Sequence, residues 1–251
     1  MLIKNRKKRS SETFEILSDK SEFAYSEAFK TLRTNFEFVA AAENRKVVML
    51  ASTLAGEGKT TVSINLAVAL AQSNKRVLVI DCDLRRPKIQ RYLRIKNSAQ
   101  NGTSTVLGGT ADIDSAIGYI EELGIYAMLA GPIPPNPSEL LSSENCKKMF
   151  EALRDRFDYI ICDTPPVTVV SDGLALSRFV DGAILVVRQN YASRSQIMQA
   201  REKLENIDAE LLGVVFNHYD SKEDSSYKYK YDKYYKYNAY YLVQVFPLKV
   251  F

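Results

Sequence analysis

The sequence has few of the residues that bind zinc or build disulfide frameworks. It contains three cysteines, Cys82, Cys146 and Cys162, and one histidine, His218. The cysteines follow no metal-binding spacing, and Cys82 and Cys162 lie in or beside apolar runs. The composition therefore argues against a zinc site, and Cys82 and Cys162 are expected to be small core or near-site residues of a protein in a reducing cytoplasm.

Long apolar runs are also lacking. No stretch approaches the roughly 18 residues that a membrane-spanning helix needs. The basic start leads into polar sequence, so we expect no secretory leader. The 251 residues suit one large α/β domain or two small ones, with enough chain to bury a sizeable core. We expect a cytoplasmic protein.

The positive charge is modest in total, +4, but it is unevenly placed. The N-terminal cluster consists of Lys4, Arg6, Lys7, Lys8 and Arg9. The lysines of the C-terminal region are Lys222, Lys228, Lys230, Lys233 and Lys236. A basic arm can attract nucleic acid or an anionic membrane surface. A solvated, disordered end is the equally weighted alternative for the N-terminal cluster.

The apolar pattern predicts a repeated alternation of strands and helices. After a mobile basic arm over 1–22, three- and four-residue apolar spacing predicts a helix over 25–43. Strands are predicted at 47–52, 77–81, near 125–129, 159–162, 182–187 and 211–216, with a helix at 60–73 and helices in most other gaps. Such short, continuously apolar strands indicate a mostly parallel sheet with helices on both faces.

A glycine-containing loop, STLAGEGKTT (52–61), follows the first predicted strand. Gly56 and Gly58 let successive backbone N–H groups point inward around an anion, and the following helix adds its positive end. Lys59 can reach the β- and γ-phosphates, and the Thr60 hydroxyl can hold Mg²⁺. The strict phosphate-loop pattern begins with glycine, where this chain has Thr53. We predict a P-loop NTPase-like α/β fold that binds ATP and Mg²⁺ through Gly56, Glu57, Gly58, Lys59, Thr60 and Thr61.

Three aspartates stand where predicted buried strands end. Asp81 and Asp83 belong to DCDLRRP, and Asp163 belongs to DTPP. In a parallel sheet these strand ends meet on the ligand-binding side. A single such aspartate is often only a helix cap, but three buried carboxylates beside a phosphate loop call for a metal or a phosphate-bound cation. Nucleotide binding is therefore the preferred interpretation.

Together these motifs resemble the bacterial tyrosine kinases of capsular and exopolysaccharide systems. STLAGEGKTT is similar to their Walker A motif, VLVIDCDLRRP to Walker A′ and YIICDTPP to Walker B. GPIPPNPSELLSS (131–143) and a terminal tyrosine cluster are also typical of the family. The resemblance covers the chain from Ser26 to about Tyr237. It implies a cytoplasmic, ATP-dependent protein-tyrosine kinase of the single-domain type, with a kinase domain at 23–220.

The resemblance also implies roles for individual residues. Lys59 and Thr60 would bind the phosphates and Mg²⁺, and Asp163 would help to place the metal. Asp81 would deprotonate the tyrosine, with Asp83 assisting at the metal. Glu27, Lys30 and Arg33 match a subunit-contact motif of a homo-oligomeric ring, with lysine in place of the first arginine.

Partners follow from the same resemblance. A membrane-embedded protein with a cytoplasmic activating segment would recruit the kinase to the inner face of the cell membrane. A cognate tyrosine phosphatase would reverse the modification, and the cycle would govern polysaccharide synthesis and export. No nucleic-acid partner is expected.

Two alternatives stay open. A partitioning-type ATPase of the same superfamily would carry a signature lysine five residues before Lys59, where this chain has Leu54. A non-catalytic nucleotide-binding adaptor would use its basic, aromatic tail, but would leave the strand-end carboxylates unexplained. Ala55 also departs from the family, in which proline is common, and the last ten residues, LVQVFPLKVF, follow no family pattern. They are interpreted as a β-pairing or partner-binding extension or an unusual terminus.

The segment YKYKYDKYYKYNAYY (227–241) contains eight of the fifteen tyrosines. Alternation with lysine and aspartate makes it too polar to build a core, so we predict a disordered tail, 221–251, that is an accessible substrate. The predicted phosphorylation sites are Tyr227, Tyr229, Tyr231, Tyr234, Tyr235, Tyr237, Tyr240 and Tyr241. From Ser221 to Tyr241 the net charge is +2, and three phosphates would bring it to roughly −3. We interpret the tail as a charge switch.

Overall fold

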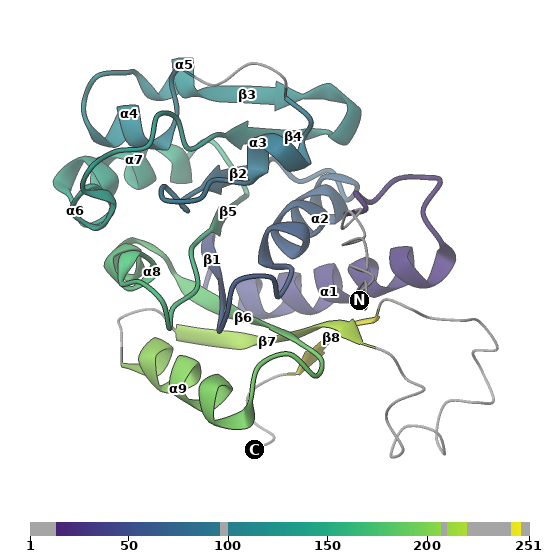
Figure 1. Cartoon of the computed structure of the whole chain (residues 1–251). Coiled ribbons are helices and arrows are strands. Elements are labelled where there is room, and N and C mark those ends of the chain that lie inside the picture. The colour runs from purple at the N-terminus through teal and green to yellow at the C-terminus, as the bar shows by residue number, and fades with distance from the viewer. Residues whose placement is uncertain (1–13, 96–99, 207–209, 220–241, 247–251) are drawn as a thin grey trace, which may run out of the picture.

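The computed structural model describes residues 14–95, 100–206, 210–219 and 242–246, and these form one mixed sheet with helices on both faces (Figure 1). The strands are β1 (Val47–Ser52), β2 (Val77–Asp81), β3 (Ile117–Ile120), β4 (Ile125–Met128), β5 (Tyr159–Asp163), β6 (Gly182–Arg188), β7 (Glu210–Tyr219) and β8 (Leu242–Phe246). Their spatial order is β3-β4-β2-β5-β1-β6-β7-β8. The pairs from β4 to β7 are parallel, whereas β3–β4 and β7–β8 are antiparallel. The predicted mostly parallel sheet is confirmed.

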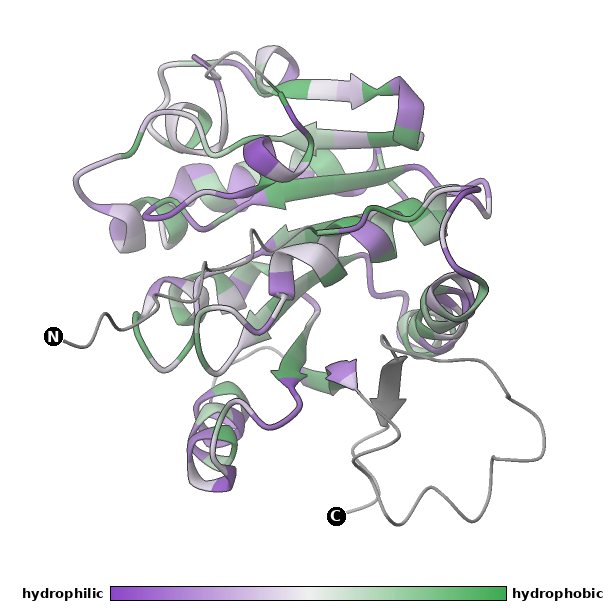
Figure 2. Cartoon of the chain, turned by 45° about the vertical axis from the view of Figure 1, so that its right-hand side comes forward, coloured by the Kyte–Doolittle hydropathy of each residue, from purple (hydrophilic) through white to green (hydrophobic). Residues whose placement is uncertain are grey.

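The helices fall into two layers. Their bounds are α1 (Phe23–Ala42), α2 (Lys59–Ala71), α3 (Ile89–Tyr92), α4 (Thr103–Leu107), α5 (Ile113–Ala116), α6 (Pro137–Leu141), α7 (Glu144–Arg154), α8 (Asp172–Leu176) and α9 (Arg194–Glu205). Helices α1 and α2 pack against one face of the sheet, and α7, α8 and α9 contribute to the core on the other. In Figure 2 the central strands are green between these layers, as expected for strands buried on both faces.

Alternation along each strand divides the core in two. In β1, Met49 and Ala51 face the core shared with α7 to α9, whereas Val48 and Leu50 face α1 and α2. Phe150 on α7 is almost fully buried, and truncating a buried phenylalanine to alanine typically costs about 3–5 kcal/mol. The helices packed on both faces of the sheet therefore hold the ends of its strands in fixed positions.

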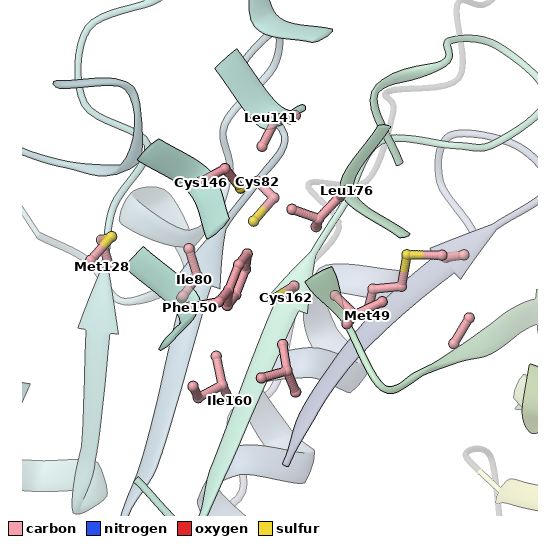
Figure 3. Packing of buried hydrophobic residues seen from close by; sticks show 14 of the residues in the cluster. Met49, Ile80, Cys82, Met128, Leu141, Cys146, Phe150, Ile160, Cys162 and Leu176 are labelled. Atoms are coloured by element: carbon pink, nitrogen blue, oxygen red, sulfur yellow. The ribbon is translucent and has the colours of Figure 1, made fainter. Parts of the chain in front are cut away.

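The three cysteines lie together in the core between the sheet and α7 (Figure 3). All are free and buried. Contact with Cys162, followed by burial, raises the pKa of the Cys82 thiol. No group of metal-binding side chains was found among the residues that the structure describes. Cys82 and Cys162 are core residues, as predicted, and Cys146 is a core residue as well.

Two segments that the sequence predicted to be mobile or disordered contain ordered structure. We expected a mobile arm through residue 22, but Leu17 is buried against the α1–α2 layer and its N–H donates to Asn65 Oδ1 at 2.6 Å. Residues 242–246, in the segment expected to be a disordered tail, form β8, which pairs with β7 and also lies against α1. Β-pairing was one of the interpretations of that segment. The eight candidate tyrosines of 227–241 lie outside the described residues.

Within the described part of the chain, no helix is both long enough and apolar enough to cross a bilayer.

Candidate active site

The phosphate loop joins the end of β1 to the start of α2. Gly56 and Gly58 have φ angles of +93° and +86°, a left-handed conformation that glycine adopts without steric cost. At Gly58 a Cβ would lie 1.9 Å from Asn217 Nδ2, so a side chain there would also have to displace the Asn217 amide. This curl lets Lys59, the first residue of α2, begin the helix directly at the loop.

Lys59, Thr60 and Asp163 form one buried cluster at the ends of β1 and β5. Lys59 Nζ lies 2.6 Å from Asp163 Oδ1, and Thr60 Oγ1 donates to Asp163 Oδ2 at 2.6 Å. Ser63, one turn into α2, also directs its hydroxyl to Asp163 Oδ1 at 3.4 Å. Lys59 is 8% exposed and Asp163 1% exposed. The structure thus brings together the Walker A and Walker B residues predicted from sequence.

Asp81 lies beside Asp163 in the sheet register but is completely buried. Its Oδ2 accepts the N–H groups of Lys88 and Ile89, each at 3.0 Å, and its Oδ1 accepts the Asp83 N–H at 3.2 Å. Burial, followed by repulsion from Asp163, raises the pKa of Asp81 to about 7 despite these hydrogen bonds. A carboxyl with this pKa can both hold and release a proton near neutral pH.

Asp83 is the member of the pair that lines the open cleft. Its Oδ1 accepts the Arg86 N–H at 3.0 Å. Burial raises its pKa, with Asp163 adding to the effect, while the Arg86 N–H, Lys59 and Lys88 act in the opposite direction. The sequence did not distinguish the two aspartates by exposure, whereas the structure places Asp83 at the cleft and Asp81 behind it.

The donor set fits a hard divalent cation. Asp83, Asp163 and Thr60 supply only oxygen atoms, which are the ligands that Mg²⁺ prefers. The pKa of Asp83 is raised, mainly by burial, so the protein leaves negative charge here incompletely compensated. A cation carried with the phosphates would compensate it.

Glu57 has different surroundings from those that the loop pattern indicates. The Glu57 side chain is 1% exposed, and its Oε2 accepts the Leu54 N–H at 2.7 Å. Burial raises its pKa. The Glu57 carboxylate therefore holds the loop through the Leu54 N–H. Gly56, Gly58 and Thr61 line the cleft as predicted, and Glu57 lies in the lining with them.

Three further residues contact the loop and were missed from sequence. Asn217, near the end of β7, donates to the Glu57 carbonyl at 2.8 Å. The Tyr191 hydroxyl donates to the Ala55 carbonyl at 2.9 Å, and Arg188 donates to the Gly56 carbonyl at 3.2 Å. Arg188 also lies 5.1 Å from the centre of the Tyr191 ring. The rule that ligand-site residues gather at strand ends could have found Asn217.

A buried carboxylate fixes the loop after β2. Asp172 is fully buried at the start of α8 and accepts Arg85 Nε at 2.7 Å and Nη2 at 3.1 Å. Ser138, within the 131–143 motif, donates to the same carboxylate. These hydrogen bonds connect the Walker A′ loop to the 131–143 motif, for which the sequence predicted no role.

The proposed subunit-contact residues lie on α1 as predicted. Glu27 and Lys30 form an ion pair of 2.8 Å with each other, and Arg33 Nη1 donates to the Ala69 carbonyl of α2 at 3.2 Å. Phe38 is 81% exposed and lies two helical turns beyond Lys30 on the same side. The exposed row on α1 therefore combines charge with an apolar residue.

Comparison with known proteins places these features in a family. Residues 45–213 match the family described as AAA domain. The chain is 37% identical to the tyrosine-protein kinase YwqD of Bacillus subtilis over 204 residues, covering 81% of this chain and 85% of the relative. It is 31% identical to the putative tyrosine-protein kinase CapB of Staphylococcus aureus, over a match that covers 90% of this chain and 98% of the relative. The structure resembles the kinase domain of the Escherichia coli tyrosine kinase ETK, with a TM-score of 0.73, 32% identity and coverage of 76% and 74%.

Proposed function

The chain belongs to the family of bacterial tyrosine-protein kinases, and from that premise we propose that it transfers the γ-phosphoryl group of ATP to tyrosines of its own 227–241 segment. The observation that carries the proposal is the buried Lys59–Asp163–Thr60 cluster at the phosphate loop, beside Asp83 at the open cleft. We further propose that this autophosphorylation regulates capsular or extracellular polysaccharide synthesis and export.

The chemistry follows from the positions of these groups. Lys59 would neutralise the β- and γ-phosphates and hold them in line with the incoming tyrosine oxygen. Thr60, Asp83 and Asp163 would hold Mg²⁺, which shields phosphate charge when it is bound. As the new tyrosine O–P bond forms and the bond to the leaving ADP oxygen breaks, the Asp81–Asp83 pair would accept the phenolic proton.

Asp81 and Asp83 have different surroundings, which favour different roles for the two carboxylates. The pKa of Asp81 lies near 7, which favours it as the final proton acceptor. Asp83 lines the cleft, which favours it as the group that first meets the phenol. We propose that Asp81 is the acceptor and that Asp83 assists at the metal.

Assembly and partners complete the proposal. Subunits would form a ring through α1, so that the tyrosine segment of one copy enters the cleft of the next. A membrane-embedded activator would recruit the kinase from the cytoplasm to the inner face of the membrane, and a cognate phosphatase would remove the phosphates. The exposed Phe38 on the same helix as Lys30 supports a protein contact on α1.

The test is mass spectrometry of the purified protein after incubation with ATP and Mg²⁺, with and without the cytoplasmic segment of a candidate activator. We expect phosphotyrosine within 227–241, and none in Lys59→Met protein whose folding is checked by circular dichroism. ATP hydrolysis without protein phosphorylation would instead assign the chain to the ATPases.

A further inference from the structure

The active-site cleft extends beyond the phosphate loop along α3, and its lining changes there. The whole cleft encloses about 1360 Å³ and includes Arg86, Lys88, Arg91, Tyr92 and Phe14. We propose that this part, together with Arg94, is a docking surface for the 227–241 segment of a second copy, and that it prefers the segment once some tyrosines carry phosphate. The inference rests on the proposed function and specifies how the substrate is recognised.

Two aromatic rings form the floor of this surface. Phe14 stacks on Tyr92 with ring centroids 4.0 Å apart and planes inclined by 21°. The two residues come from opposite sides of the phosphate loop in the sequence, and neither is fully buried. A stacked pair of half-buried rings offers a flat apolar surface on which a phenol ring can pack.

The N-terminal segment that carries Phe14 is held by a buried amide. Asn65 of α2 is completely buried. Its Oδ1 accepts the Leu17 N–H at 2.6 Å, and its Nδ2 donates to the Glu15 carbonyl at 2.9 Å and to the Tyr25 hydroxyl at 2.8 Å. These hydrogen bonds fix the backbone next to Phe14, so the aromatic floor is part of the folded domain.

Four cations surround this floor. Arg86, Lys88, Arg91 and Arg94 are all exposed, and no ion pair joins any of them to another residue in the described ranges. Arg85 differs, because Asp172 holds its guanidinium. Glu15 and Glu122 are the acids on this part of the lining, apart from Asp83 itself. The surface therefore carries positive charge that the fold does not compensate.

A tyrosine-rich segment that is already partly phosphorylated fits both features. Tyrosine rings can stack on the aromatic floor, and arginine binds phosphate through two parallel hydrogen bonds. Unmodified, residues 221–241 carry a net charge of +2 and are repelled. Two phosphates bring the segment to roughly −1 to −2, and repulsion becomes attraction. Each transfer thus favours the next on the same acceptor.

A bilayer also presents phosphate, but the position of the surface favours a peptide. The cations line a cleft that leads to Asp83, and Lys88 is near enough to act on that carboxylate. A flat lipid headgroup layer cannot enter a cleft, whereas an extended chain can.

The experiment uses two synthetic peptides of residues 221–241, one unmodified and one with phosphate on both Tyr229 and Tyr231. With the full-length kinase we expect a KM roughly tenfold lower for the phosphorylated peptide at low salt, since a few surface charge pairs contribute about this much. The Arg91→Gln/Arg94→Gln variant should lose the difference and show the same KM for both peptides. The matched control is Lys147→Gln/Lys148→Gln, which removes two exposed cations from α7.

The aromatic floor is tested separately. Phe14→Ala should raise KM for both peptides, and Phe14→Tyr should restore it. Equal KM values for the two peptides in the wild type, or an unchanged preference in the Arg91/Arg94 variant, would overturn the docking surface.

Binding is measured in parallel, by fluorescence anisotropy of the labelled peptides without ATP. Absence of transfer to either peptide, with the binding preference intact, would refute the proposed kinase function and leave the docking surface standing. Binding to vesicles of phosphatidylglycerol, but to neither peptide, would assign the cations to a membrane and refute the surface as proposed.

Discussion

Replacing Asp81 by asparagine should make the protein more stable at alkaline pH while it removes kinase activity. The reason is the cost of a buried carboxylate. The pKa of Asp81 is raised from its ordinary 3.8 to about 7 by burial and by Asp163. The roughly three pH units between these values, at about 1.4 kcal/mol each, correspond to about 4 kcal/mol.

The sign follows from where the proton resides. Between pH 4 and 7 the unfolded chain has released the Asp81 proton while the folded protein retains it, so the stability of the wild type falls as pH rises through this window. Above about pH 7 the contribution levels off. Asparagine does not titrate, so the difference in unfolding free energy between variant and wild type should grow by about 4 kcal/mol from pH 4 to pH 8.

One hydrogen bond determines the difference in unfolding free energy between the two proteins at acidic pH. In the wild type, Asp81 Oδ1 accepts the Asp83 N–H, and the amide group of asparagine would present a donor there. We expect this mismatch to cost about 1 kcal/mol. The variant should therefore be slightly less stable than the wild type at pH 4.5 and more stable by roughly 3 kcal/mol at pH 8.

The assay is urea unfolding of both proteins at half-unit pH intervals from 4.5 to 8, in EDTA and without nucleotide. EDTA matters because a bound cation would lower the pKa of the carboxylates. Titrations of other groups are common to both proteins and cancel in the difference. Parallel stability curves across this range would refute the assignment of an uncompensated charge to Asp81.

Three further outcomes test other parts of the site. Lys59→Met should cost about 3 kcal/mol in stability as well as activity, because it leaves Asp163 buried without its partner; adding Asp163→Asn should restore the urea midpoint but not the kinase activity. The kcat/KM of the wild type should rise with pH through about 7, as Asp81 loses its proton, and a profile that is flat there would remove Asp81 as proton acceptor. Phe38→Asp should shift the particle toward monomer by light scattering with an unchanged unfolding midpoint, since the side chain is 81% exposed; an unchanged mass would exclude this side of α1 from the subunit contact.

The sequence predicted those parts of the site that depend on regular structure. Continuous apolar runs located the six strands from β1 to β7 apart from β3, and residues at the ends of buried parallel strands must meet on one side of the sheet. Lys59, Thr60 and Asp163, which the structure joins by contacts of 2.6 Å, are therefore predictable from the sequence. The short edge strand β3 was not predicted: it has four residues, IGYI, and lacks a buried face, with Gly118 and Tyr119 exposed, so it is too short to stand out as a buried strand.

Contacts between distant loops could not be predicted in the same way. The pairing of Arg85 with Asp172 joins residues 87 positions apart, and nothing in either local pattern specifies the other. Asn65 is polar within an apolar helix, and periodicity alone does not reveal that it binds the backbone of residues 15 and 17. The difference between Asp81 and Asp83 likewise depends on packing, because alternation along a strand end does not fix which carboxylate reaches solvent.

The pairing of β8 with β7 changes how the tyrosine segment can act. Tyr219 and Leu242 are partners in the sheet register, so the 22 residues between them begin and end at one edge. Each residue of the segment is tied to both Tyr219 and Leu242. Its greatest distance from the edge is therefore set by the nearer of these two residues, at about 3.5 Å for each intervening step along the chain. Tyr231 can lie up to about 38 Å from this edge, whereas Tyr240 can lie only about 7 Å from it. While β8 stays paired, the chain length therefore gives Tyr231 the longest reach from this edge and gives Tyr240 and Tyr241 the shortest. Strand β8 itself lies against α1. Transfer to these last two tyrosines in a neighbouring cleft would require β8 to detach, and phosphate there would add negative charge beside the helix proposed to join the subunits.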